Sequence, residues 1–307
     1  MTHIYLFNKE AFASEYGIGT YIRQLTECLQ NCENISLTIV QLFCSNKNEF
    51  VIEESEMIRT IYCPRPVTST PNILEKYHRN VWHLIYPYIQ VNNHDKLIFH
   101  LNYDAEYPLL EKMKQDFPSC QTIFTIHYQE WCFKLKGNTS YFKHIIHKRK
   151  EEIIDDEEKE VVRSYDKEKK LYAFVDKIIC LSDYTKQLLI DEYQISSKKI
   201  VKIYNGLSDE GVILNECAKN ELKKKLGFAK KDKIILFVGR IDEIKGIDVL
   251  IKSFNQIATE YSNYKLVVIG NGKLASKCMQ DINDCWGKIH FTGRLEKNIL
   301  YKFYQIA

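Results

Sequence analysis

The strongest constraint on the fold is a regular alternation of short apolar segments with longer helical ones. The short segments are rich in β-branched and aromatic residues, and the longer segments carry apolar residues at helical spacing. This alternation predicts a parallel sheet with helices on both of its faces. In the first two thirds of the chain, strands are expected at residues 3–8, 36–43, 57–63, 96–101, 121–128, 177–182 and 199–205.

The same alternation starts again after residue 232. A polar, helical connection between residues 206 and 233 separates the two series. We therefore predict an α/β chain with two Rossmann-like doubly wound domains that face each other across a cleft, residues 1–206 and 207–307. In the second domain, strands are expected at residues 233–239, 265–270 and 288–293, and helices at 247–260, near 274–284 and from about 296.

Composition and charge exclude several classes of protein. The 307 residues are 45% hydrophobic, which suits two folded cores. A net charge of +3, from 43 basic and 40 acidic residues, argues against a nucleic-acid binder. No signal peptide is expected, because the first residues lack a basic region followed by a long apolar stretch, and no run reaches the roughly 18 apolar residues that a membrane span needs. Weak attraction to an anionic membrane surface stays open.

The cysteines and the charged segment argue against a metal site. Ten cysteines are scattered without a C-x-x-C pair, which is typical of reduced thiols in a cytoplasmic protein. The run KRKEEIIDDEEKE, residues 148–160, mixes both signs of charge. It predicts a solvated helix face rather than a cage of metal-binding carboxylates.

Two glycines, Gly17 and Gly19, lie between the first apolar segment and an amphipathic helical pattern. The order strand, glycine loop, helix is the start of a βαβ unit, in which backbone can approach an anionic ligand closely. A loop that is merely tight explains the glycines equally well. A third glycine is missing, since residue 22 is Ile, and the next strand ends without an early acidic residue. A nicotinamide enzyme is therefore disfavoured.

The strongest chemical signal is FVGRIDEIKGIDVLIKSF, residues 237–254. A buried strand ends at Gly239, Arg240 follows at once, and Lys245 stands just before a helix. Ligands of open α/β sheets bind beyond the carboxyl ends of the strands. Two cations and a helix N-terminus at that place favour an anion site suited to a diphosphate, with Arg240 able to hold two oxygens. The spacing does not match a Walker A loop.

These segments carry a family resemblance that covers essentially the whole chain. VGRIDEIKGIDVLIKSF, VVIGNG and IHFTGRL resemble the donor domain of a retaining GT-B glycosyltransferase of glycosyltransferase family 4. EYGIGTY, TIHYQEW, ICLSDYTK and IYNGL follow the order of that family's first domain. The resemblance implies a GT-B-like fold with an acceptor-side first domain and a donor-side second domain.

The resemblance also implies roles for single residues. Gly17 and Gly19 match a loop near the donor phosphates and the acceptor. Arg240 and Lys245 match the pair that binds the donor diphosphate, and His127 matches a histidine near the transferred sugar. Gly270 and Gly272 match a loop where backbone approaches the nucleotide, and Gly293 and Arg294 match a place where backbone lies against the base. Gly239 is expected among the donor-binding residues as well.

The implied activity is transfer of a hexose from a nucleoside-diphosphate sugar with retention of anomeric configuration. Arg240 and Lys245 would stabilise the leaving diphosphate, so no metal and no cofactor are expected. The acceptor is expected to be a glycan, a lipid-linked precursor or a peptide. Its pocket is expected in the first domain, where aromatic residues could stack on sugars: Tyr16, Tyr103, Tyr128, Trp131 and Phe133. Cytoplasmic location, with peripheral association to the inner face of a membrane left open, completes this expectation.

Two other functions stay open on the sequence. The family's E-x7-E motif would follow residue 307, so the second domain is expected to be incomplete and the chain truncated. A non-catalytic nucleotide-sugar binding protein, or an inactive fragment, is therefore one alternative. A GT-B sugar-nucleotide epimerase is the other. The donor nucleotide, its sugar and the linkage formed cannot be predicted from these residues.

Overall fold

The computed structural model describes residues 1–10, 17–55, 58–67, 70–92, 94–103, 107–207, 211–280, 282 and 285–307. The chain divides into two compact units, Met1–Leu207 and Ser208–Ala307, called unit 1 and unit 2 below. The boundary expected from the sequence differs from this division by one residue. The acceptor and donor roles expected for the two halves stay predictions.

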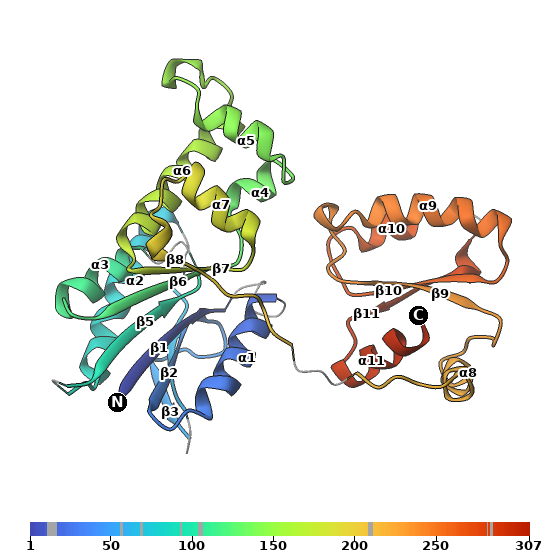
Figure 1. Cartoon of the computed structure of the whole chain (residues 1–307), viewed down its shortest axis with the longest axis horizontal. Coiled ribbons are helices and arrows are strands. Elements are labelled where there is room, and N and C mark those ends of the chain that lie inside the picture. The colour runs from blue at the N-terminus through green and yellow to red at the C-terminus, as the bar shows by residue number, and fades with distance from the viewer. Residues whose placement is uncertain are drawn as a thin grey trace. The chain divides into compact units, whose positions relative to one another are not determined.

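Unit 1 is built on an eight-stranded sheet with the order β3-β4-β2-β1-β5-β6-β7-β8 (Figure 1). Neighbouring strands are parallel except for β3, which pairs antiparallel with β4 at one edge. The strands are β1 (Thr2–Lys9), β2 (Ile35–Cys44), β3 (Val51–Glu54), β4 (Arg59–Pro64), β5 (Lys96–Leu101), β6 (Gln121–Ile126), β7 (Lys177–Cys180) and β8 (Ile200–Lys202). The predicted strands are present, and the short β3 was not predicted.

Helices cover both faces of this sheet. On one face α1 packs Ile18 and Ile22 against Leu6 of β1. On the opposite face, Trp82 of α2 lies in one cluster with Phe7 and with the apolar residues of α3. Alternate residues of β1 are thus buried on opposite faces, as in other parallel sheets. The helices are α1 (Gly17–Gln30), α2 (Pro71–Ile85), α3 (Tyr107–Asp116), α4 (Glu130–Lys134), α5 (Thr139–Ile146), α6 (Asp156–Phe174) and α7 (Asp183–Asp191), with short 3-10 turns η2 (Tyr86–Tyr88), η4 (Lys150–Glu152) and η5 (Ser197–Lys199).

Unit 2 repeats this plan on a smaller scale. Its parallel sheet has the order β11-β10-β9, with α9 and α10 on one face and α8 and α11 on the other (Figure 1). The prediction of an α/β fold with doubly wound parallel sheets is confirmed. The elements are α8 (Glu216–Lys225), β9 (Lys233–Val238), η6 (Glu243–Lys245), α9 (Ile247–Glu260), β10 (Tyr264–Ile269), α10 (Ala275–Gln280), η7 (Trp286–Lys288), β11 (Ile289–Gly293) and α11 (Lys297–Ile306).

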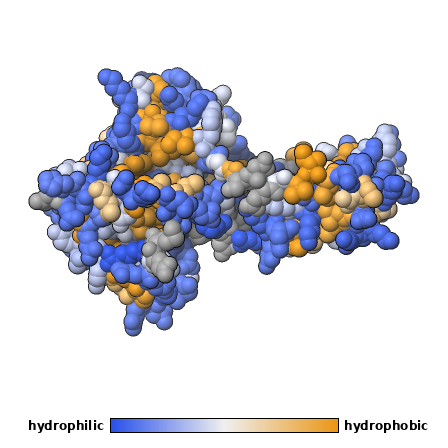
Figure 2. Space-filling view, turned by 60° about the horizontal axis from the view of Figure 1, so that its bottom comes forward, coloured by the Kyte–Doolittle hydropathy of each residue, from blue (hydrophilic) through white to orange (hydrophobic). Residues whose placement is uncertain are grey.

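A buried polar contact interrupts the charged segment that was expected to be fully solvated. Glu158 in the first turn of α6 is only 5% exposed. Its Oε1 accepts hydrogen bonds from Lys148 Nζ at 2.6 Å and from the hydroxyl of Tyr141 at 2.8 Å. The expectation is therefore wrong for Glu158, because the opposite charge in the same run allows the carboxylate to be buried. On the face of the molecule drawn in Figure 2, hydrophilic residues surround separate apolar patches.

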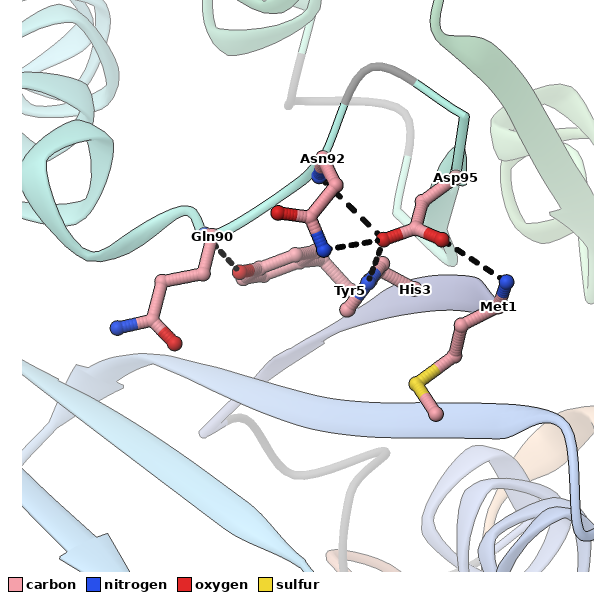
Figure 3. A network of polar contacts seen from close by, with 6 residues as sticks. All are labelled: Met1, His3, Tyr5, Gln90, Asn92 and Asp95. Carbon is pink, nitrogen blue, oxygen red and sulfur yellow. Dashed lines mark hydrogen bonds and ion pairs between the residues drawn. The ribbon is translucent and has the colours of Figure 1, made fainter.

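Asp95, just before β5, joins several polar groups at the amino-terminal ends of the strands in unit 1 (Figure 3). Its Oδ1 accepts from the ammonium group of Met1 at 2.9 Å, and its Oδ2 lies 3.2 Å from Nε2 of His3. The side-chain amide of Asn92 also donates to Oδ2, at 2.9 Å. These contacts hold the pKa of Asp95 well below its usual range, the ammonium group having the largest effect. They tie β1 to the start of β5, at the end of the sheet opposite the candidate site.

Candidate functional site

In unit 1, the carboxyl ends of the central strands carry a chain of hydrogen-bonded polar side chains. His127 follows β6, and its Nε2 lies 2.9 Å from Oδ1 of Asn102, which follows β5. The amide Nδ2 of Asn102 donates to the backbone oxygen of Phe7 in β1 at 3.0 Å. Asn102 therefore joins the ends of three neighbouring strands and orients the ring of His127.

The same contacts define the protonation state of His127. Because Asn102 presents its carbonyl oxygen, Nε2 of the imidazole must donate the hydrogen. Burial lowers the pKa of His127 to about 4, so the ring is neutral at pH 7. Nδ1 is then the acceptor nitrogen of the ring. His127 can therefore exchange hydrogen bonds with a hydroxyl group, but it does not supply a positive charge at neutral pH.

A second buried histidine and a tyrosine connect His127 to α1. Nε2 of His100 in β5 lies 2.7 Å from Oγ1 of Thr125, and the hydroxyl of Tyr21 in α1 lies 3.2 Å from the same oxygen. The ring of Tyr21 packs edge-on against His127, with centroids 4.7 Å apart. Burial lowers the pKa of His100 to about 4, and the proximity of His127 contributes to the shift. The beginning of α1 therefore lies beside His127.

Gly17 and Gly19 lie in the first turn of α1, so the expectation that they form a loop is wrong. Glycine is tolerated where a helix begins, and the amphipathic pattern extends further back than the glycines suggested. A side chain at Gly17 would meet no atom within 4 Å, whereas Gly19 is buried. Residues 11–16, which precede them, lie outside the described residues. A contact of either glycine with a donor or an acceptor stays a prediction.

In unit 2, the loops that follow the three strands are hydrogen-bonded side by side. The backbone N–H of Gly239 donates to Ile269 at 3.0 Å, and the N–H of Gly270 donates to Gly293 at 2.9 Å. A further bond of 3.0 Å runs from Ile241 to Asn271. The carboxyl ends of the three strands thus carry four of the predicted glycines, Gly239, Gly270, Gly272 and Gly293. We call this edge, residues 239–242, 270–274 and 293–294, the strand-end platform.

Close backbone contact explains two of these glycines. A Cβ atom on Gly270 would lie 1.9 Å from the backbone oxygen of Gly239, and one on Gly272 would lie 2.3 Å from that of Ile241. Such distances are impossible, so the adjoining loops could not pack in this way with any side chain at either position. Contact between two loops of the protein is therefore enough to require glycine at both positions. That Gly270 and Gly272 also approach a nucleotide stays a prediction.

Arg240 and Lys245 belong to one short segment that Asp242 organises. Nη2 of Arg240 lies 3.1 Å from Oδ2 of Asp242, and both side chains are partly buried. Oδ1 of Asp242 accepts a hydrogen bond from the backbone N–H of Lys245 at 3.2 Å and so caps η6. The side chain of Lys245 is exposed just before α9. Asp242 therefore orients the guanidinium and shapes the turn that carries the lysine.

The third predicted cation follows β11. Gly293 ends that strand with a φ of 70°, a conformation that favours glycine, and the exposed Arg294 comes next. Arg240, Lys245 and Arg294 therefore all lie at or just beyond the carboxyl ends of strands in unit 2. A helix N-terminus and cations at such an edge can bind an anionic group.

The aromatic residues expected to stack on sugars divide into three groups. Tyr103 and Trp131 are 4% and 1% exposed, so the expectation is wrong for them because they are packed in the core. Tyr128 and Phe133 are exposed, with ring centroids 5.3 Å apart. Tyr16 lies outside the described residues. Stacking on Tyr128 or Phe133 stays a prediction.

Sequence reasoning missed Asn102 and Asp242. Asn102 directly follows the apolar segment KLIFHL, and a polar residue at that place could have been noted as a strand-end group. Asp242 stands three residues before Lys245, a position at which Asp commonly caps a helical turn. Both residues orient a predicted site residue.

The described part of the chain lacks a cluster of metal-binding side chains and a helix suited to a membrane. It contains no group of three or more His, Cys, Asp or Glu side chains placed to hold a metal ion. Across the same residues, no helix combines the length and the apolar character that crossing a membrane requires. Each of the ten cysteines is a free thiol.

Family comparisons match nearly the whole chain. The profile described as Glycosyltransferase Family 4 matches residues 16–210, and the profile described as Glycosyl transferases group 1 matches residues 218–307. Spore coat protein SA of Bacillus subtilis is 26% identical over 133 residues, 40% of this chain and 33% of that protein. The chain aligns with about a third of the length of the first curated relatives, from 33% to 36%.

Solved structures of similar fold cover the full chain. Sucrose-phosphate synthase from Thermosynechococcus elongatus has a TM-score of 0.71 at 19% identity, with 100% of this chain and 74% of that one covered. The catalytic domain of starch synthase IV from Arabidopsis thaliana, bound to ADP and acarbose, has a TM-score of 0.63 at 13% identity, with 100% and 76% covered. At these identities the similarity concerns the fold.

Proposed function

Because the chain belongs to glycosyltransferase family 4, we propose that it transfers a hexose from a nucleoside-diphosphate sugar to an acceptor with retention of anomeric configuration. The family assignment supports the reaction class. Retention, the hexose and the kind of acceptor are the finer parts of the proposal. A glycan, a lipid-linked precursor or a peptide would serve as the acceptor.

The observation that carries the proposal is the strand-end platform of unit 2. Its three hydrogen-bonded loops present a guanidinium, Arg240, whose direction is set by Asp242. Lys245 follows Asp242 by three residues and lies just before the N-terminus of α9. In open α/β sheets this edge is where anionic ligands bind. We assign it to the donor diphosphate.

The same residues would lower the barrier to transfer. As the bond between the sugar and the diphosphate breaks, negative charge develops on the leaving phosphate. A guanidinium held by Asp242 needs little reorganisation, so its effect on the transition state is larger than on the ground state. The proposal assigns this role to Arg240 and Lys245 without a metal ion.

We assign His127 to the sugar rather than to proton transfer. Its neutral ring offers Nδ1 as an acceptor, while Nε2 is engaged with Asn102. A hydroxyl of the transferred hexose can donate to Nδ1. A general acid would need a pKa closer to neutrality than about 4.

Product analysis tests the proposal. The protein is incubated with UDP- and GDP-hexoses, with and without a panel of glycan acceptors, in the presence of EDTA. We expect nucleoside diphosphate release that depends on the acceptor, and an NMR coupling at the new linkage that matches the donor anomer. Release or epimerisation with donor alone, at a rate that the acceptor does not change, would contradict transfer. An inverted product would contradict retention only.

A further inference from the structure

We propose that Tyr21 of α1 is a positioning residue, which acts through His127 on the sugar that is transferred. Its hydroxyl contacts Thr125 in β6, and its ring contacts His127 just beyond that strand. The role in transfer rests on the proposed function, whereas the effect of Tyr21 on the imidazole does not.

The alternation of side chains along a strand explains how one tyrosine reaches both groups. Residues two apart in a strand point to the same face, and Thr125 and His127 are two apart. The ring of Tyr21 packs edge-on against the imidazole, with centroids 4.7 Å apart and an interplanar angle of 71°. Its hydroxyl lies 3.2 Å from Oγ1 of Thr125. The side chain therefore spans from α1 to β6 beside His127.

The hydroxyl of Thr125 is a fixed anchor for this contact. Thr125 is fully buried, and its Oγ1 lies 2.7 Å from Nε2 of His100 in β5, the strand that pairs with β6. Burial lowers the pKa of His100 to about 4, so its ring is neutral at pH 7 and no charge is buried here. Two adjacent strands thus hold the oxygen to which Tyr21 is tied.

The imidazole of His127 has one other support. Asn102 contacts its Nε2 at 2.9 Å, but a ring held by a single hydrogen bond can still pivot about that bond. The packed ring of Tyr21 restricts this motion and keeps water away from one side of the imidazole. Nδ1 of His127, which we assign to a sugar hydroxyl, therefore keeps one direction while Tyr21 stays in place.

The same contact ties the beginning of α1 to the candidate site. Gly17, the first residue of α1, precedes Tyr21 by about one helical turn, so both lie on the same side of the helix. Packing alone is the competing explanation, because Tyr21 also packs against the apolar cluster between α1 and the sheet. A role in packing and a role in positioning predict different effects on His127.

Tyr21→Phe gives the sharpest test, because it keeps the ring and removes the hydroxyl. In imidazole-selective 1H–15N NMR at pH 7, the unaltered protein should show His127 as the Nε2–H tautomer, and the variant should show both neutral tautomers. The rate of transfer should fall roughly 2- to 12-fold, the worth of one hydrogen bond, with unchanged affinity for free nucleoside diphosphate. A tyrosine that only packs would lower the urea midpoint and leave the tautomer and the rate unchanged, which would overturn the inference.

Three further variants examine the ring and the anchor. Tyr21→Leu admits water to one side of the imidazole, so the pKa of His127 should rise from about 4 toward the ordinary value of about 6.5. Thr125→Val should reproduce the effects of Tyr21→Phe on tautomer and rate, whereas Thr125→Ser keeps the hydroxyl and should behave as the unaltered protein. An unchanged pKa in Tyr21→Leu, or equal behaviour of the two Thr125 variants, would contradict the inference.

Tyr165→Phe is the matched control. It removes a hydroxyl of α6 that donates to the backbone oxygen of Glu192 at 2.7 Å, so the tautomer of His127 and the rate should not change. Equal effects of Tyr165→Phe and Tyr21→Phe would point to a general loss of stability and overturn the inference. If the unaltered protein transferred no sugar while the NMR results agreed with expectation, the proposed function would fail and the effect of Tyr21 on the imidazole would stand.

Discussion

At the scale of single residues, the polar partner of a buried histidine determines the chemistry that the histidine can perform. Asn102 orients the ring of His127 and assigns its tautomer. In imidazole-selective 1H–15N NMR, we expect the Nε2–H tautomer at pH 7 and titration near pH 4. Titration near 6.5, the ordinary value, would contradict the assignment.

Because folding favours the neutral forms of His100 and His127, the free energy of unfolding should fall as the pH decreases from about 6.5 to 4.

Replacing His127 distinguishes a role in sugar transfer from a role in nucleotide binding. His127→Ala should lower the rate of transfer by about 10-fold, the worth of one buried hydrogen bond. The affinity for free nucleoside diphosphate should stay nearly the same, because the diphosphate is assigned to unit 2. Initial rates and calorimetric titration of the same preparation provide the comparison. Loss of nucleotide affinity with an unchanged rate would place the sugar elsewhere.

At the scale of elements, the strand-end platform depends on glycine. Gly270→Ala and Gly272→Ala should each lower the free energy of unfolding of unit 2 by about 1–3 kcal/mol or more, because the new methyl group overlaps backbone oxygens. Nucleoside diphosphate affinity should fall with it. Gly287→Ala is a matched control, since a Cβ there would meet no atom within 4 Å. Denaturant unfolding at 25 °C measures all three, and equal stability of the Gly270 and control variants would refute the close contact.

The Asp95 contacts give a second prediction at this scale. Asp95→Asn should lower the urea midpoint at pH 7, because the carboxylate loses its bonds to Met1 and His3 (Figure 3). The folded-state pKa is depressed, so this contribution is present above the unfolded value near 3.9 and is lost as pH falls. The two proteins, with nothing added before Met1, should therefore converge in midpoint at low pH. Asp156→Asn, in an exposed pair, should change little. A pH-independent difference would contradict the role of the charge.

The elements differ in how far the sequence predicts them. The parallel strands β9 and β10 are continuous apolar runs, and their predicted bounds agree with the structure within a residue or two, although only β10 is largely buried. β3 has only four residues, half of them exposed, and its pairing with β4 gives no comparable apolar signal. The start of α1 was misplaced because glycine is a weak helix former, although it is tolerated in the first turn.

At the scale of the whole molecule, two units repeat one architecture, and the alternation of segments predicts both of them. The partners within the site are harder to predict, because they come from different strands. His127 and Asn102 are 25 residues apart in the sequence and meet only when β5 and β6 pair. The packing of Gly270 against Gly239 depends in the same way on adjacent strands. Local sequence patterns thus predict the fold class, whereas the orientation of the site residues depends on the order of the strands in the sheet.

The central claim is that the strand-end platform of unit 2 binds the donor diphosphate through Arg240, and calorimetric titration with UDP and GDP tests it most directly. Of the two nucleotides, the one that binds more tightly to the unaltered protein is compared. We expect Arg240→Ala to lower the affinity for it roughly 10- to 150-fold, the equivalent of about 1.5–3 kcal/mol for a charge-assisted contact. Lys245→Ala should act in the same direction, and the double variant should lose less than the sum. Arg149→Ala removes an exposed arginine paired with Glu152 in unit 1 and should bind normally. Unchanged affinity in Arg240→Ala would contradict the account.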